Sequence, residues 1–238
     1  MRFAPRRASR RTVSGPHHER QRAINASAGV ALPDPLREPW SDIARQREAA
    51  TLGMWLFLMS EMLFFGTVFM AFSFSRALNV SEFEAGARET EIVYGASNTF
   101  VLVTSSLTIT LAVRAANIAN RRLAARLLAA TALLGAVFLV VKGLEYRDDL
   151  KHHLYPTLNF ALGENATQIF WAFYWIMTGI HAFHLFVGIG LVSRLAWLVP
   201  RSRLSLQSPQ LEVTSLYWHL VDAFWIVLFP VLYIAGRG

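Results

Sequence analysis

Five apolar stretches, each about 20 residues or longer, constrain this chain more than any other feature. They cover residues 53–74, 94–113, 124–146, 170–198 and 213–235. A bilayer core about 30 Å thick needs about 20 apolar residues of α-helix to cross it, and a helix satisfies its own backbone hydrogen bonds in lipid. The chain is therefore predicted to be all-α, a polytopic membrane protein built as a bundle of five transmembrane helices.

Composition agrees with a membrane protein and excludes several other classes. Charged residues make up 16% of the 238 residues, whereas soluble domains carry about 25%. The chain contains no cysteine, which excludes disulfide frameworks, thiolate metal sites, iron–sulfur clusters and cysteine nucleophiles. A Gly-rich phosphate loop and the spacing of a Ser-His-Asp triad are also absent from the sequence. We therefore predict no catalytic residues in this chain.

The first 50 residues form an Arg-rich tail, with ten Arg against five acidic residues. We expect this tail to be disordered or bound to the cytoplasmic membrane surface, and residues 51–238 to form the transmembrane domain. The tail supplies most of the formal net charge of +7. Because it lacks the interleaved aromatic residues of a nucleic-acid groove, we expect no nucleic-acid partner.

The charges of the connecting segments predict the orientation in the membrane. The tail, the gap between the second and third spans and the gap between the fourth and fifth spans are rich in Arg, whereas the other two gaps are rich in acidic residues. Positively charged segments stay on the cytoplasmic side. This pattern places the N-terminus in the cytoplasm and the C-terminus outside.

Glu61 is the sharpest functional candidate, because ionisable residues inside membrane spans are usually functional. The residues three and four positions away on its helix are apolar, and no cation shares its face. Two interpretations remain open. Glu61 is either a carboxyl that exchanges protons or contacts lipid, or a protonated carboxyl that hydrogen-bonds across a helix interface.

Histidine residues recur at helical spacing in the last two spans. His219 and Asp222 lie three residues apart, so they can share a face and bond to each other, as an orienting pair, or to a neighbouring helix. His181 and His184 have the same spacing in the fourth span. One Asp–His pair falls short of the three or four ligands of a metal site, and two His on one helix face cannot bind opposite faces of one haem. We predict no metal site and no cofactor in this chain.

Two features near the ends of spans predict local structure. Lys142 and Glu145 lie three residues apart near the outer interface, which predicts a snorkelling Lys paired with Glu and anchored by Tyr146. Pro230 cannot donate to the carbonyl of Ile226, which predicts a bend in the fifth span.

Each span carries a short motif that includes polar residues at fixed spacing. In chain order the motifs are residues 53–65 (GMWLFLMSEMLFF), 97–99 (SNT), 142–146 (KGLEY), 178–184 (TGIHAFH) and 217–226 (YWHLVDAFWI). In the same order they resemble segments of subunit III of the haem–copper cytochrome c and quinol oxidases, including G-x-x-x-F-L-x-S-E-x-x-F-F, T-G-x-H-x-x-H and Y-W-H-x-V-D-x-x-W. The resemblance covers residues 51–236, which include all five predicted helices.

The resemblance implies the short, five-helix form of this family, a multi-pass protein of a bacterial inner (plasma) membrane. Such a subunit binds no haem or copper. It flanks subunit I, which holds both, in a complex of the aerobic respiratory chain that also contains subunit II. The resemblance further implies phospholipid bound in a cleft between the helices, and a role in proton uptake and in the stability of the complex during turnover.

The family's functional residues map singly onto this sequence. Glu61 corresponds to the family's buried membrane carboxyl. The internal polar anchors implied by the motifs are His219, Asp222, His181, His184 and Glu145. The Arg-rich tail and Lys142, one turn before Glu145, depart from the family pattern.

Two alternatives to the oxidase assignment remain open from the sequence. Accessory proteins of nitric oxide reductases resemble the same short form, so the partners are oxidase subunits or nitric oxide reductase subunits. A stand-alone proton-coupled transporter would use Glu61 and Asp222 as a proton relay. The lack of internal repeats and of broken helices argues against the transporter.

Overall fold

The computed structural model describes residues 43–156, 165–201, 204, 206, 208–235 and 237. The part of the Arg-rich tail up to residue 42 lies outside these residues, so the expectation for that part stays a prediction. The elements are α2 (Ile43–Leu78), α3 (Val80–Arg88), α4 (Ile92–Asn117), α5 (Arg121–Lys151), α6 (Asn165–Leu198), α7 (Pro209–Phe229) and the π-helical turn η1 (Pro230–Ile234). Among the described residues there is no β-strand.

Five of these helices are long and apolar enough to cross a membrane, which confirms the predicted fold class. They extend beyond the apolar stretches because helical hydrogen bonding continues into the polar ends. Asn120 caps α5 by accepting a hydrogen bond from the backbone N–H of Leu123. Ser208 caps α7, and Pro209 follows as the first helical residue. Both arrangements satisfy or remove backbone donors that a helix N-terminus leaves free.

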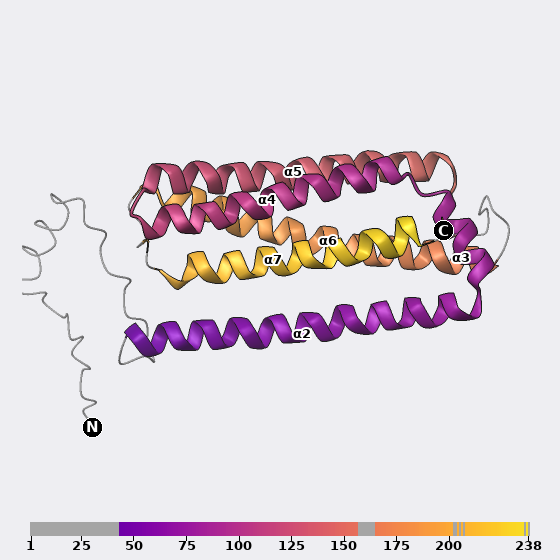
Figure 1. The fold of residues 1–238 in the computed structure, drawn as a ribbon, viewed down its shortest axis with the longest axis horizontal. Helices are drawn as coiled ribbons and strands as arrows, with labels where there is room; N and C mark the ends of the chain where they lie inside the picture. The colour runs from indigo at the N-terminus through magenta and orange to yellow at the C-terminus, as the bar shows by residue number, and fades with distance from the viewer. Residues whose placement is uncertain are drawn as a thin grey trace, which may run out of the picture.

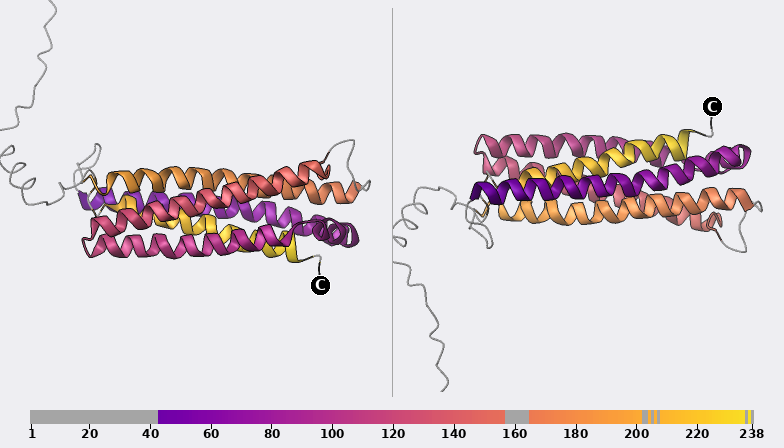
Figure 2. Two further views of the ribbon diagram at one scale, coloured as in Figure 1. Left: turned by 90° about the horizontal axis from the view of Figure 1, so that it is seen from above. Right: turned by 90° about the horizontal axis from the view of Figure 1, so that it is seen from below.

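The five long helices lie side by side along one common direction (Figures 1 and 2). The helices α4 and α5 pack closely along their length, and α6 and α7 complete the bundle against them. The core between these four helices is aromatic, with Trp171, Trp218 and Trp225 fully buried. Helix α2 lies at the edge of the bundle and contacts mainly α7 and α6. One side of α2 therefore stays open to whatever surrounds the bundle.

The short helix α3 lies between the first two spans, in a segment that was predicted only as a connection. Phe83 of α3 is buried and packs edge-on against Phe72 and Phe170. The acidic residues of α3 lie on its partly exposed side. Because this helix is amphipathic, it covers one end of the bundle.

Pro230 changes the helix in a specific way. The α-helix ends at Phe229, and the chain continues as one π-helical turn in which the backbone N–H of Ala235 donates to the carbonyl of Pro230, at 2.9 Å. A π-helical turn is a common response to an interrupted α-helical hydrogen-bond ladder. The turn carries Tyr233 into the core, where it is fully buried.

The beginning of α2, the α4–α5 connection and the beginning of α7 lie at one end of the bundle, and α3 and the C-terminus lie at the other (Figure 1). This arrangement matches the alternation of loop charges. We expect a C-terminal alkaline phosphatase fusion to be active and a C-terminal green fluorescent protein fusion to be dark in bacterial cells. An inactive phosphatase together with a bright C-terminal fluorescent fusion would contradict the orientation predicted from the loop charges.

Candidate functional site

Glu61 meets a partner from another helix. Its Oε2 lies 3.1 Å from Nε2 of His184, and both side chains are 17% exposed. Helix α2 supplies the carboxyl and α6 the imidazole, and the ring of Phe65 packs edge-on against His184. Tyr217 of α7 donates a hydrogen bond to the carbonyl of His184, at 2.9 Å. The structure therefore places two of the predicted site residues in direct contact across a helix interface.

The two ring nitrogens of His184 have different neighbours. Its Nδ1 lies 2.9 Å from the carbonyl oxygen of Ile180. A carbonyl oxygen only accepts, so Nδ1 carries a hydrogen atom in this contact. Nε2 faces Oε2 of Glu61 at 3.1 Å, a close polar contact that lacks the alignment of a hydrogen bond. Oε2 of Glu61 thus has no hydrogen-bond partner among the described residues, although it is buried beside the interface.

The Glu61–His184 pair lines a groove of about 550 Å³ between α2, α6 and α7. The walls are mostly apolar and include Phe57, Phe183 and Leu191. Polar side chains in the groove are few, and Arg194 and Gln210 lie within 3.5 Å of each other on its wall. An apolar groove with a few polar groups suits an elongated amphipathic ligand.

His219 does not pair with Asp222 in the structure, so the predicted orienting pair is wrong. The second predicted arrangement, a bond to a neighbouring helix, is confirmed for His219. Its Nδ1 lies 2.8 Å from Oγ of Ser106 and its Nε2 lies 3.4 Å from Oγ1 of Thr110, both on α4. The three-residue spacing left both orientations possible, and the row of hydroxyls on α4 decided between them.

His181 lies where no polar partner reaches it. It is fully buried, and neither ring nitrogen has a hydrogen-bond partner among the described residues. Its ring packs against Phe138, at 5.5 Å between ring centroids, and against Trp225, at 5.1 Å. The structure thus separates His181 from His184, which faces the groove.

Lys142 does not snorkel to the interface, contrary to the prediction. The residue is 2% exposed and forms an ion pair of 3.1 Å with Glu145, which is 1% exposed. Its Nζ also donates hydrogen bonds to the hydroxyls of Tyr174 (2.9 Å) and Tyr233 (2.7 Å). The pairing with Glu145 is therefore confirmed. The side chain of Lys142 nevertheless points into the bundle, because two hydroxyls and a carboxylate replace water as its partners.

This buried network also includes a carboxyl that the sequence suggested was a loop charge. The hydroxyl of Tyr174 donates to Glu145, at 2.7 Å, and lies 3.0 Å from Asp149. Tyr233 donates to Glu145 at 2.6 Å. The network therefore joins α5, α6 and η1. The spacing of Lys142, Glu145 and Asp149 at positions i, i+3 and i+7 was the signal in the sequence that placed them on one helix stripe.

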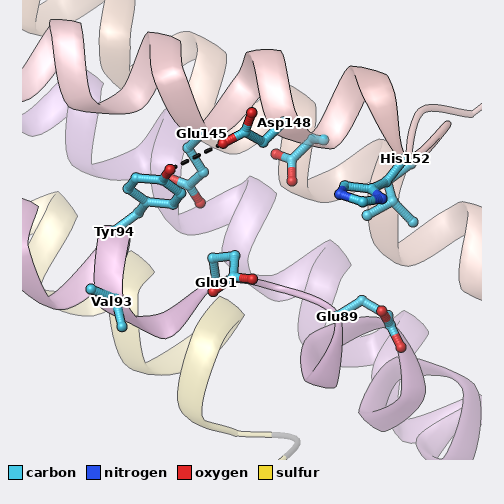
Figure 3. Close-up of a pocket in the computed structure, with 9 residues that line it drawn as sticks. Glu89, Glu91, Val93, Tyr94, Glu145, Asp148 and His152 are labelled. Carbon is cyan, nitrogen blue, oxygen red and sulfur yellow. Dashed lines mark hydrogen bonds between the residues drawn. The ribbon is translucent and has the colours of Figure 1, made fainter.

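The network borders an acidic pocket of about 660 Å³ (Figure 3). The α3–α4 connection supplies Glu89 and Glu91, and α5 supplies Glu145, Asp148 and Asp149. The hydroxyl of Tyr94 donates to Asp148, at 3.0 Å. Among the described residues, no group of three or more His, Cys, Asp or Glu side chains has the arrangement of a metal site.

These observations define a class of protein: a multi-pass helical membrane protein in which several buried polar side chains pair between its helices. A sequence model of the family described as cytochrome c oxidase subunit III matches residues 43–237. The chain belongs to that family. The match covers every helix that the structure describes.

Individual relatives are named as oxidase subunits. The cytochrome c oxidase subunit 3 of Thermostichus vulcanus is 32% identical over 194 residues, which cover 78% of this chain and 87% of the relative. That of Corynebacterium diphtheriae is 31% identical over 191 residues, covering 77% and 86%. The probable quinol oxidase subunit 3 of Staphylococcus saprophyticus is 29% identical over 189 residues, covering 78% and 88%.

The comparisons confirm the family and the function expected from the motifs, subunit III of a haem–copper oxidase, a member of a multi-subunit oxidase complex. They do not favour the nitric oxide reductase accessory protein or the stand-alone transporter. The specific roles of the predicted site residues stay predictions; these residues are Glu61, His184, His181, His219, Asp222 and Glu145.

Proposed function

We propose that this chain flanks subunits I and II of a bacterial haem–copper oxidase as a non-catalytic subunit, binds phospholipid in the groove beside Glu61, and supports proton uptake and stability during turnover. Haem and copper belong to subunit I in this proposal. The observation that carries it is the groove between α2, α6 and α7, with the Glu61–His184 pair on its wall.

The dimensions and chemistry of the groove suit a phospholipid. Arg194 follows His184 by ten residues on α6, which corresponds to roughly 15 Å along the helix axis. An acyl chain can cover the apolar wall over that distance, and the guanidinium of Arg194 can pair with the phosphate. By the predicted orientation, Arg194 lies toward the cytoplasmic side. The lipid would thus reach from the cytoplasmic headgroup layer to the Glu61–His184 pair.

Co-purification tests the assignment to an oxidase. A C-terminal tag and mild solubilisation of native membranes should bring down subunits I and II, identified by mass spectrometry, with a reduced-minus-oxidised haem spectrum. Nitric oxide reductase chains in their place would move the protein to that system. A haem-free protein without partners would contradict the proposal.

The variant Glu61→Gln tests the role of the Glu61 carboxyl. Because Gln is nearly isosteric with Glu and its amide can keep the contact with Nε2 of His184, we expect the free energy of assembly to change by less than about 1 kcal/mol. We expect less phospholipid per haem, or faster inactivation of the complex during turnover, because the ionisable carboxyl is gone.

The matched control is Glu89→Gln, an exposed carboxyl between α3 and α4 and outside the Glu61 groove, which should leave both readouts unchanged. Phospholipid per haem is measured by mass spectrometry and inactivation by oxygen consumption over time. Failure of Glu61→Gln to assemble would favour a purely structural role for Glu61.

A further inference from the structure

A second groove, of about 310 Å³, lies between α4 and α7, away from the Glu61 groove. Its rim is apolar and exposed, with Val103 and Leu107 on α4 and Ile226 on α7. Asp222 lines this groove and is only 4% exposed. Neither of its carboxyl oxygens has a hydrogen-bond partner among the described residues.

The nearest hydroxyl does not satisfy Asp222. Ser106 lies beside the carboxyl, but Ser106 also contacts Nδ1 of His219. Thr110 donates its proton to the carbonyl of Ser106, so its Oγ1 accepts from Nε2–H of His219. In the neutral imidazole Nδ1 is then the acceptor and takes the single proton of Ser106. Among the described residues no donor is then left for Asp222.

The depth of Asp222 limits what could satisfy it from outside. It lies 13 residues after Pro209 and 12 before Ile234, or roughly 20 Å from either end of this helical segment along its axis. Phospholipid headgroups do not reach that depth, and acyl chains carry no polar atom. A carboxyl in contact with lipid alone would stay without a partner, at a cost of several kcal/mol.

Two other buried polar side chains without partners, Asn98 and His181, differ from Asp222 in one respect. Asn98 and His181 are fully enclosed within the bundle, so nothing outside this chain can reach them. Asp222 instead borders a groove whose rim is exposed. The position of its carboxyl thus points to a partner in the membrane plane.

From the unpartnered Asp222 in this groove, we infer that the α4–α7 face is an interface that receives a transmembrane helix of a partner subunit carrying a hydrogen-bond-donating side chain at mid-membrane depth. The donor is a hydroxyl, amide, imidazole or basic group, and the apolar rim packs around it. Interhelical hydrogen bonds of this kind stabilise contacts between membrane helices. The inference rests on the proposed function, because it needs an oxidase partner in the membrane.

Site-specific photo-crosslinking in the assembled complex tests this interface. A benzoyl-phenylalanine at position 107, on the groove rim, should crosslink to a membrane helix of a partner subunit, identified by mass spectrometry. The matched control is the same residue at position 133 on α5, where Leu133 is 66% exposed and lies outside the groove. Crosslinks from position 133 and none from 107 would overturn the inference, and so would adducts at 107 with lipid alone or with a second copy of this chain.

Substitutions at Asp222 give a second, independent measure. Asp222→Leu should lower the amount of this subunit retained per haem after a detergent wash by about threefold to fifteenfold, the range for one interhelical hydrogen bond in a membrane. Asp222→Asn keeps an acceptor oxygen and should be retained like the wild type. Equal retention of the wild type, Asp222→Leu and Asp222→Asn would overturn the inference.

Two controls separate the possible failures. Monodisperse elution of the free Asp222→Leu subunit shows that this variant folds. If the variant does not fold, the crosslinking result, obtained in a chain that keeps Asp222, tests the inference by itself. Absence of any oxidase subunit from the wild-type preparation would contradict the proposed function and the inference together. Co-purification with crosslinks from position 133 only would contradict the inference alone.

Discussion

Replacing Lys142 with Met is expected to lower the free energy of unfolding by about 3–5 kcal/mol, the usual cost of removing one partner of a buried ion pair. Lys142 is the cation that balances Glu145, and it also donates to the hydroxyls of Tyr174 and Tyr233. Without it, a carboxylate and two hydroxyls lose a partner inside the bundle. Thermal unfolding of the purified subunit in detergent measures the effect.

A control variant on the same helix distinguishes this effect from a loss of charge. Lys151 pairs with Asp148 at 3.0 Å, but its side chain is 60% exposed. Lys151→Met should therefore change the stability by less than about 1 kcal/mol. The double variant K142M/E145Q should recover part of the loss, because it removes both charges. Equal effects of Lys142→Met and Lys151→Met would show that the buried network does not stabilise the fold.

Replacing Gly135 with Ala is expected to destabilise the bundle by about 1–3 kcal/mol through overpacking. A Cβ atom at Gly135 would lie 2.7 Å from the ring of Trp218 and 2.9 Å from Ile189. Trp218 is fully buried and its indole N–H donates to Ser105, so the ring cannot move aside without losing that bond. The contact between α5, α6 and α7 would have to open.

Gly143, on the same helix, provides the matched control. A Cβ atom there would meet nothing within 4 Å, so Gly143→Ala should leave the stability unchanged or raise it by up to about 1 kcal/mol. The melting temperatures of both variants in detergent give the comparison. A loss of stability in Gly143→Ala as large as in Gly135→Ala would contradict the prediction, because it would show that the close contacts of Gly135 do not set the effect.

The sequence predicted the five spans well because each is a long apolar run, and lipid leaves a helix as the simplest solution. It predicted their ends less well, since α2 begins at Ile43 and α5 continues to Lys151. The helices continue beyond the apolar core of the membrane, because capping side chains and water satisfy the free backbone groups at the helix ends. Helix α3 was missed because nine residues of amphipathic pattern are a weak signal.

The candidate site depended on contacts between segments far apart in the chain. Glu61 was identified as a candidate because a carboxyl in an apolar span is unusual. Its partner could not be identified from the sequence, since only the packing of α2 against α6 brings His184 close to Glu61. Lys142 was misplaced for the same reason. Its position near a span end suggested the interface, whereas Tyr233, from the last helical turn of the chain, reaches back to hold it inside.

The Glu61–His184 pair has a consequence for how the membrane voltage acts on this subunit. The two facing atoms, Oε2 and Nε2, lie 3.1 Å apart. That is about a tenth of the hydrocarbon thickness, so displacing one elementary charge from one atom to the other is worth at most about 0.2 kcal/mol per 100 mV of potential. An energised membrane therefore barely biases this contact, and its geometry should be the same whether the cell is resting or respiring.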